Sequence, residues 1–265
     1  MSEGNEVSKY VTTHFSEYLK SFENFKRGNY NKALISTFLK LEKSLKSEAS
    51  NAELNEYKSV QENNDSLTSI IRNDSQGISF NSGCVGCVVL ITKKKIYVAN
   101  LGNTKCLLCK SGKIYELSKD HTPSNPLEKK RIDKANGKII SNKIDGFLKA
   151  SRTLGDYQYK NNLTLSNESQ IIISTPDICE EVITPECEYL FIGSNGICEC
   201  LSPLLIESMI NVKMKKLDLK NPGSTIRMIL EELFESVLAS SIVINSGIGC
   251  DNMSCIVIKF KKTKQ

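Results

Sequence analysis

The feature that most constrains this fold is a stretch of apolar runs separated by very short polar breaks. Four runs are typical of β-strands: residues 84–92, 96–101, 104–109 and 113–117. The breaks between them contain only two or three residues. Parallel strands need a crossover of a dozen or more residues, so these strands are predicted to be antiparallel neighbours joined by hairpins.

Helix-like periodicity precedes this stretch, since apolar residues recur every three or four positions. The inward faces are predicted to contain Val7, Tyr10, Val11, Phe15 and Leu19 in a first helix and Ala33, Leu34, Phe38, Leu41 and Leu45 in a second. Later helices are predicted at 126–136, 203–216 and 222–240, and later strands at 138–142, 146–151, 170–175, 179–184, 188–194 and 251–260. This order favours an α+β layered fold.

Composition indicates an ordinary globular chain, with 265 residues of which 40% are hydrophobic and 25% charged. We expect one domain, with the polar residues 47–82 forming a partly flexible connection. No apolar run approaches the roughly 18 residues of a membrane span, so we expect a cytoplasmic or nuclear protein without a membrane partner. The net charge of +5 comes mostly from Lys, which does not favour a nucleic-acid partner.

Four of the ten cysteines form pairs at zinc-ribbon spacing, Cys84 with Cys87 and Cys106 with Cys109. Both pairs lie in predicted strands, where residues three apart point to opposite faces. We therefore expect small buried thiols, and a zinc module stays as a third hypothesis that elemental analysis would test.

Six blocks follow one another along the chain in a recognisable order. They are SGCVG, YVANLGNTK, LSKDHTPSNPLEKKRI, ASRTLGD, FIGSNGICECLS and GCDNMS. Together they resemble the metal-dependent PP2C (PPM-type) Ser/Thr protein phosphatases, whose patterns are SGSTA, YVANxGDSR, LSxDHxPxxxxExxRI, SRxxGD, ASDGxWDxLS and GxxDNMT. The resemblance runs from about residue 6 to the end and implies a β-sandwich of two antiparallel sheets flanked by helices.

For active members, the resemblance also implies two Mn²⁺ or Mg²⁺ ions. Such ions need several carboxylate oxygens, and they activate a bridging water that attacks the phosphoester. Three departures affect these carboxylates. The DGHGG motif and the strands before it are absent from the sequence, Asn195 replaces the Asp of SDG, and Asn103 replaces the Asp of GDSR.

Some site positions keep their chemistry. Asp251 is the residual metal-ligand position, and Glu199 stands where SDGxWD has its second acid. Supporting positions are Gly102, Gly196, Asp156 and Asn252. Several of these positions can also have a purely structural role. Asn195-Gly196 is a good turn pair, and Asp251 can cap its own loop. Asp156 and Arg152 can be structural as well. His121 is expected to fix a loop, and we predict no catalytic residue.

The first functional hypothesis is therefore a catalytically impaired pseudophosphatase that binds a protein partner or phosphoprotein and holds no metal tightly. The alternative is an active Mn- or Mg-dependent phosphatase whose first motif lies upstream of this sequence. An amide oxygen brings no charge to offset a divalent ion, which favours the first hypothesis.

Overall fold

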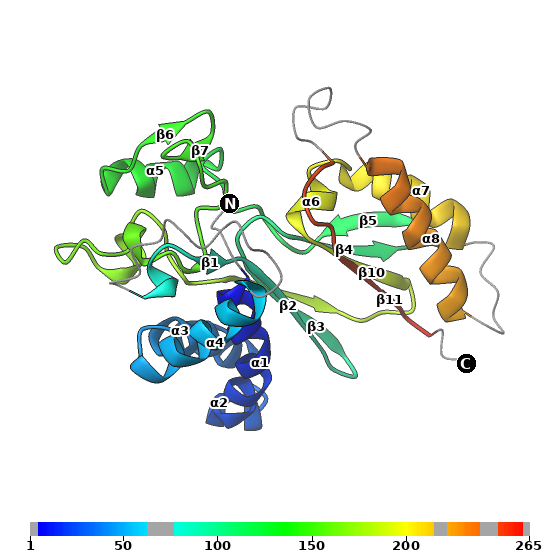
Figure 1. Ribbon diagram of the computed structural model, residues 1–265. Coiled ribbons are helices and arrows are strands. Elements are labelled where there is room, and N and C mark those ends of the chain that lie inside the picture. The colour runs from blue at the N-terminus through cyan, green and yellow to red at the C-terminus, as the bar shows by residue number, and fades with distance from the viewer. Residues whose placement is uncertain (1–4, 63–76, 215–221, 239–248, 262–265) are drawn as a thin grey trace. The chain divides into compact units, whose positions relative to one another are not determined.

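The computed structural model describes residues 5–62, 77–214, 222–238 and 249–261 (Figure 1). By its contacts the chain divides into two compact units, each assembled from several segments. Unit 1 contains residues 1–86, 99–102 and 120–178. Unit 2 contains residues 87–98, 103–119 and 179–265.

Unit 1 begins with helices, coloured blue to cyan in Figure 1. They are α1 (Glu6–Ser21), α2 (Glu23–Lys26), α3 (Tyr30–Ser44) and α4 (Glu48–Glu62). The predicted inward face of the second helix is confirmed, since all five of its residues are buried. In the first helix Val7, Tyr10 and Leu19 are buried, whereas Val11 and Phe15 are partly exposed.

Helix α4 lies within the predicted connection at 47–82. Sequence reasoning missed it because its apolar periodicity is weak, although Leu54 is fully buried. Residues 63–76 of the same stretch lie outside the described residues.

The rest of unit 1 is rich in loops. It contains a pairing of β1 (Gly83–Cys84) with β8 (Leu154–Gly155), helix α5 (Pro126–Lys134), the hairpin β6 (Ile139–Ile140) and β7 (Lys143–Ile144), and the 3₁₀ turns η2 (Ile78–Phe80), η3 (Tyr157–Tyr159) and η4 (Asn167–Ser169). The predicted strands at 146–151 and 170–175 are wrong. Only isolated bridges form there, between Ile144 and Leu148 and between Arg152 and Ile173, because these apolar residues fill a small core instead of extending a sheet.

The two larger sheets lie mostly in unit 2. One sheet has the order β11 (Cys255–Lys259), β10 (Cys187–Gly193), β4 (Lys105–Lys110) and β5 (Lys113–Glu116), with every pair antiparallel. The other has the order β2 (Gly86–Ile91), β3 (Lys95–Leu101) and β9 (Asp177–Val182). The predicted hairpin between 96–101 and 104–109 is wrong, because β3 and β4 belong to different sheets.

A buried core explains this separation. Ile96 and Val98 of β3 pack with Cys106 and Leu108 of β4, so the two strands meet through side chains instead of main-chain hydrogen bonds. The Gly102-Asn103 break therefore carries the chain from one layer of the sandwich to the other.

A second core lies on the opposite face of the four-stranded sheet. There Leu107, Tyr189 and Phe191 pack against α7 (Pro203–Met214) and α8 (Pro222–Val237). Figure 1 shows both helices beside this sheet. None of the described helices has the length and apolar character that crossing a bilayer requires.

The cysteine pair in β4 follows the predicted alternation of faces. Cys106 packs in the core between the sheets, and Cys109 packs in the core under α7 and α8. Their thiols therefore point away from each other, and zinc held by both is not supported by this geometry.

Candidate functional site

The turn after β10 is held against the start of β11. Ser194 precedes the short helix α6 (Asn195–Cys198). Its N–H donates to the Ser254 carbonyl at 2.9 Å, and its Oγ accepts from the Ser254 N–H at 3.0 Å. Two motifs some sixty residues apart in the sequence are thereby joined at one end of the sheet.

Two amide side chains meet at this turn. Asn103 Nδ2 donates to Asn195 Oδ1 at 2.7 Å, and Asn195 Nδ2 approaches Glu199 Oε2 at 3.4 Å. Asn103 precedes β4 and Asn195 follows β10, so pairing of these two strands brings the residues together. The result is a polar cluster in which the two amides are partly buried and Glu199 is exposed, and we call it the amide cluster (Asn103, Asn195 and Glu199).

The Asp251 turn lies against Gly196. A Cβ on Gly196 would overlap the Asn252 carbonyl oxygen and come within 3.3 Å of Asp251 Cβ. Asp251 Oδ1 accepts from the Asn252 N–H at 2.8 Å. Asp251 therefore uses one carboxylate oxygen within its own loop, and it lies next to the turn that carries Asn195.

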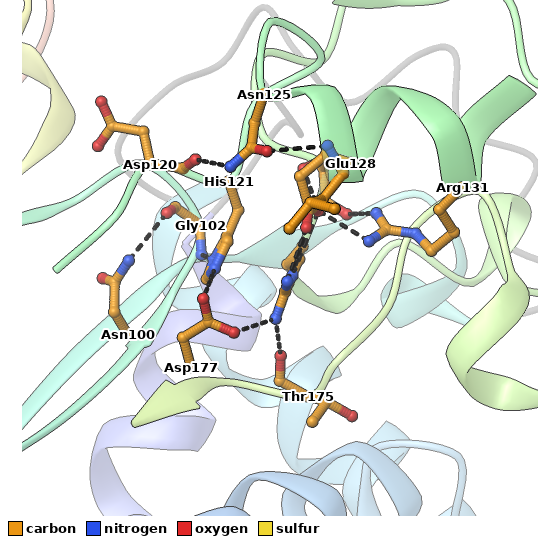
Figure 2. Close-up of polar contacts among 12 residues, drawn as sticks. Asn100, Gly102, Asp120, His121, Asn125, Glu128, Arg131, Thr175 and Asp177 are labelled. Carbon is orange, nitrogen blue, oxygen red and sulfur yellow. Dashed lines mark hydrogen bonds and ion pairs between the residues drawn. The ribbon is translucent and has the colours of Figure 1, made fainter. Parts of the chain in front are cut away.

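Gly102 and His121 form a separate loop-fixing contact in unit 1 (Figure 2). The Gly102 N–H donates to His121 Nδ1 at 3.1 Å, and the Gly102 carbonyl accepts from the His121 N–H at 3.1 Å. Gly102 has φ +102°, and a Cβ there would overlap Val85 Cγ1. Because Nδ1 accepts a hydrogen bond, the ring proton belongs on Nε2, which lies 3.1 Å from Asp177 Oδ2.

Glu128 is the centre of a buried ionic network, which we call the Glu128 network (Figure 2). Its carboxylate accepts from Arg131 at 2.8 Å, from Arg152 at 2.6 Å and from the Ser151 hydroxyl at 2.6 Å. Burial alone would raise the pKa of Glu128, but the hydrogen bond from Arg152 and the charge of Arg131 hold that pKa below its ordinary value.

Asp177 lies at the edge of the Glu128 network. It accepts from Arg152 at 2.8 Å and is half-exposed. The contact with His121, followed by the charge of Arg152, lowers the pKa of Asp177 to about 2. Asp177 therefore connects the His121 loop to the network.

Asp156 is also in unit 1, deeply buried and in the left-handed backbone region at φ +51°. Its N–H donates to the Ser82 carbonyl at 3.0 Å, and its carboxylate packs so closely on Gly83 that a Cβ there would overlap it. Burial raises the pKa of Asp156. These contacts give Asp156 a local structural role between β1 and β8.

The sequence model of the family Protein phosphatase 2C (PP2C) matches residues 1–240. The chain belongs to the PP2C family. It is 34% identical over 258 residues to "Probable protein phosphatase 2C 5" of Paramecium tetraurelia, covering 97% of this chain and 80% of the relative. It is 33% identical over 259 residues to "Probable protein phosphatase 2C 2" of the same organism, covering 98% and 80%.

The fold agrees with this membership. A solved phosphatase from a pathogenic strain of Toxoplasma gondii superposes with a TM-score of 0.67 at 18% identity, covering 98% of this chain and 82% of that one. The predicted PP2C-like architecture of sheets and helices is confirmed.

The structure brings some of the predicted PP2C site residues together. Asn103, Asn195 and Glu199 form the amide cluster, and Gly196 contacts the Asp251-Asn252 turn, all within unit 2. Gly102 and Asp156 belong to unit 1, where each holds a local turn.

The donor set does not fit the two divalent ions of active PP2C members. Asn195 Oδ1 is already an acceptor for Asn103, and an amide carries no charge to offset a cation. Within the described ranges, no three His, Cys, Asp or Glu side chains are grouped so that they could hold a metal ion. We therefore derive no catalytic step through a metal.

Sequence reasoning did not single out Glu128, Arg131 or Asp177. The ExxR spacing on α5 was a usable signal, because residues three apart share a helix face. Asp177 had no such signal, because Arg152 is 25 residues away in the sequence and His121 is further still.

Proposed function

We propose that this PP2C-family chain is a phosphatase-like binding protein, catalytically impaired, that uses the PP2C fold to hold a protein partner or phosphoprotein. The observation that carries the proposal is the direct 2.7 Å hydrogen bond between Asn103 and Asn195. These residues replace the two Asp of the GDSR and SDG patterns.

The physical argument concerns charge. Two carboxylates at this distance would repel each other unless a cation lay between them. Two amides satisfy each other directly, since one donates and the other accepts. The amide cluster is therefore stable without an ion, while the turn around it is kept by the Ser194 and Gly196 contacts.

Two further features support the proposal. Glu199 is exposed and Asp251 is half-exposed, so water already solvates the two remaining carboxylates. Asp251 also uses one oxygen for its own loop. Two carboxylates of this kind supply fewer charged ligands than a two-ion centre needs.

The test combines metal binding, turnover and peptide binding on the same protein preparation. We expect Mn²⁺ calorimetry to show no site tighter than the millimolar range and phosphopeptide hydrolysis to stay at the level of an EDTA control. Binding of phosphopeptides, measured by fluorescence anisotropy, is expected to be unchanged by EDTA. Asn195→Asp serves as the matched variant, and it alone should not create Mn²⁺-dependent turnover.

The alternative function is an active Mn- or Mg-dependent phosphatase whose first motif lies upstream of this sequence, and it predicts metal-dependent turnover in a longer protein that carries this motif. Metal-dependent turnover in the chain as given would rule out the impaired protein. Turnover that arises only in Asn195→Asp would show that this one amide, and not the wider loss of carboxylates, blocks catalysis.

A further inference from the structure

Three cysteine side chains lie in the core between the two larger sheets. Cys106 of β4 is fully buried there, while Cys87 of β2 and Cys179 of β9 pack against the same core and are partly exposed. All three belong to unit 2 and are free thiols. The thiols of Cys87 and Cys106 are in hydrogen-bond contact with each other. Two thiols in contact can be oxidised together, which a single buried thiol cannot.

Strand alternation explains why these two thiols meet. Cys87 shares one face of β2 with Val89, and Cys106 shares one face of β4 with Leu108, because residues two apart in a strand point the same way. Both faces line the core between the sheets. Cys87 also reaches the hydroxyl of Thr104, just before β4. The two layers are therefore close enough here for short side chains to touch across them.

The two thiols differ in chemical character. The Cys106 thiol donates to the Cys87 sulfur, and this hydrogen bond lowers the pKa of Cys87 against the effect of burial. The same hydrogen bond, followed by burial, raises the pKa of Cys106. The partly exposed Cys87 is thus the thiol that ionises more readily, and the thiolate is the form that reacts with oxidants.

We propose that Cys87 and Cys106 are a redox pair that hydrogen peroxide oxidises to a disulfide between the two sheets. The Cys87 thiolate attacks one peroxide oxygen, the O–O bond breaks, and the products are a sulfenic acid on Cys87 and a first water. The Cys106 sulfur then displaces the hydroxyl group of the sulfenic acid as a second water. In total, two thiols lose two electrons and two protons, and one peroxide becomes two waters.

The geometry favours this bond over others in the same core. Sulfurs already in contact need only a short approach to reach a disulfide bond length of about 2.05 Å. The bond would close the chain between Cys87 and Cys106 into a loop, which stabilises a fold by constraining its unfolded state. It would also tie the strand that follows Asn103 to the facing sheet. This chemistry requires no metal and no partner, so it goes beyond the proposed function.

The test is disulfide mapping by mass spectrometry on the full 265-residue chain, treated with hydrogen peroxide and then alkylated with iodoacetamide. We expect two peptides joined through Cys87 and Cys106, about 2 Da lighter than the sum of the two thiol peptides. Dithiothreitol should separate them. The oxidised chain should melt about 5 °C higher than the reduced chain.

Two variants make the test specific. Cys179→Ser removes the third thiol of the same core and should leave the linked peptides unchanged. Cys106→Ala removes the thiol that resolves the sulfenic acid, so dimedone should then label Cys87. Absence of that label would show that Cys87 is not the attacking thiol.

The exposed Cys250 reports whether the dose of peroxide was effective. If Cys250 is oxidised while Cys87 and Cys106 are both recovered as alkylated thiols, the proposal is wrong. A disulfide that joins either cysteine to Cys179 instead also overturns it.

Discussion

The Glu128 network in unit 1 and the amide cluster in unit 2 differ in how they treat negative charge. The first keeps a buried carboxylate, and the second has amides at two positions where the family pattern has carboxylates. Glu128 is buried and keeps its charge, because two arginines and a serine surround its carboxylate. Asn195 lies where the family pattern has an Asp, and the groups that meet it are another amide and the Glu199 carboxylate.

The difference shows which carboxylate position retains its negative charge in this chain. A buried carboxylate is tolerated when protein cations and hydrogen-bond donors compensate the lost hydration. At the amide cluster no Lys or Arg contact to Asn103 or Asn195 occurs among the described residues, and only an external ion would compensate carboxylates there. The carboxylate is therefore present at Glu128, where Arg131 and Arg152 of the same chain compensate its negative charge.

Glu128→Gln should produce the largest effect, because it leaves Arg131 and Arg152 without their buried counter-charge. Breaking a buried ion pair on one side costs about 3–5 kcal/mol. Urea unfolding measures the change in free energy.

The control is Glu23→Gln, which removes an exposed pair with Lys26 and should cost at most about 0.5 kcal/mol. Equal losses in the two variants would mean that the Glu128 network contributes no more than a surface pair.

The double variant Asn103→Asp, Asn195→Asp makes the amide cluster charged without adding protein cations. We expect stability at neutral pH to fall by roughly 1–2 kcal/mol through like-charge repulsion. Added Mn²⁺ should restore it, since an ion that binds the folded state stabilises it. Thermal melts with and without Mn²⁺ measure both effects, and Asn195→Asp alone is the control. A double variant as stable as the parent in EDTA would contradict the role of the amide pair.

Substitution of Asp177 should produce the smallest change in the free energy of unfolding, and only over a defined pH range. Its pKa is lowered from 3.8 to about 2 in the folded state. A depressed carboxyl pKa contributes stability that is present above pH 3.8 and lost as the pH falls toward 2. Because Asp177 is half-exposed, solvent screening reduces the contribution to about 1 kcal/mol.

Asp177→Asn should therefore reduce the loss of unfolding free energy as the pH falls from about 4 to 2, with little other effect on stability. The measurement is urea unfolding between pH 2 and 5, compared with the parent chain. An unchanged acid limb would show that the contacts with His121 and Arg152 do not stabilise the ionised form.

Much of the fold was predictable because its signals are local. Alternation and short breaks located β2 to β5, and helical periodicity located α3 with its buried face. The sequence also placed Asn195 in a turn that ends a strand. Helix α4 was missed, because it is amphipathic only weakly and is fixed by packing on α1.

Pairing between distant segments was not predictable in the same way. A two-residue break such as Gly102-Asn103 is compatible with a hairpin, and only the side-chain core between the sheets decides that β3 and β4 separate. Likewise, the exchange of Asp for Asn at 103 and 195 is visible in the sequence, but their mutual hydrogen bond is not.

The sequence by itself determined the family blocks, the strand and turn positions and the loss of acidity at two site positions. The tertiary structure decided that the two amides bond to each other, that Glu128 has two arginine partners and that β11 ends its sheet within the described residues. Periodicity and turn chemistry act over a few residues, whereas charge compensation and sheet order depend on side chains that meet across long sequence separations.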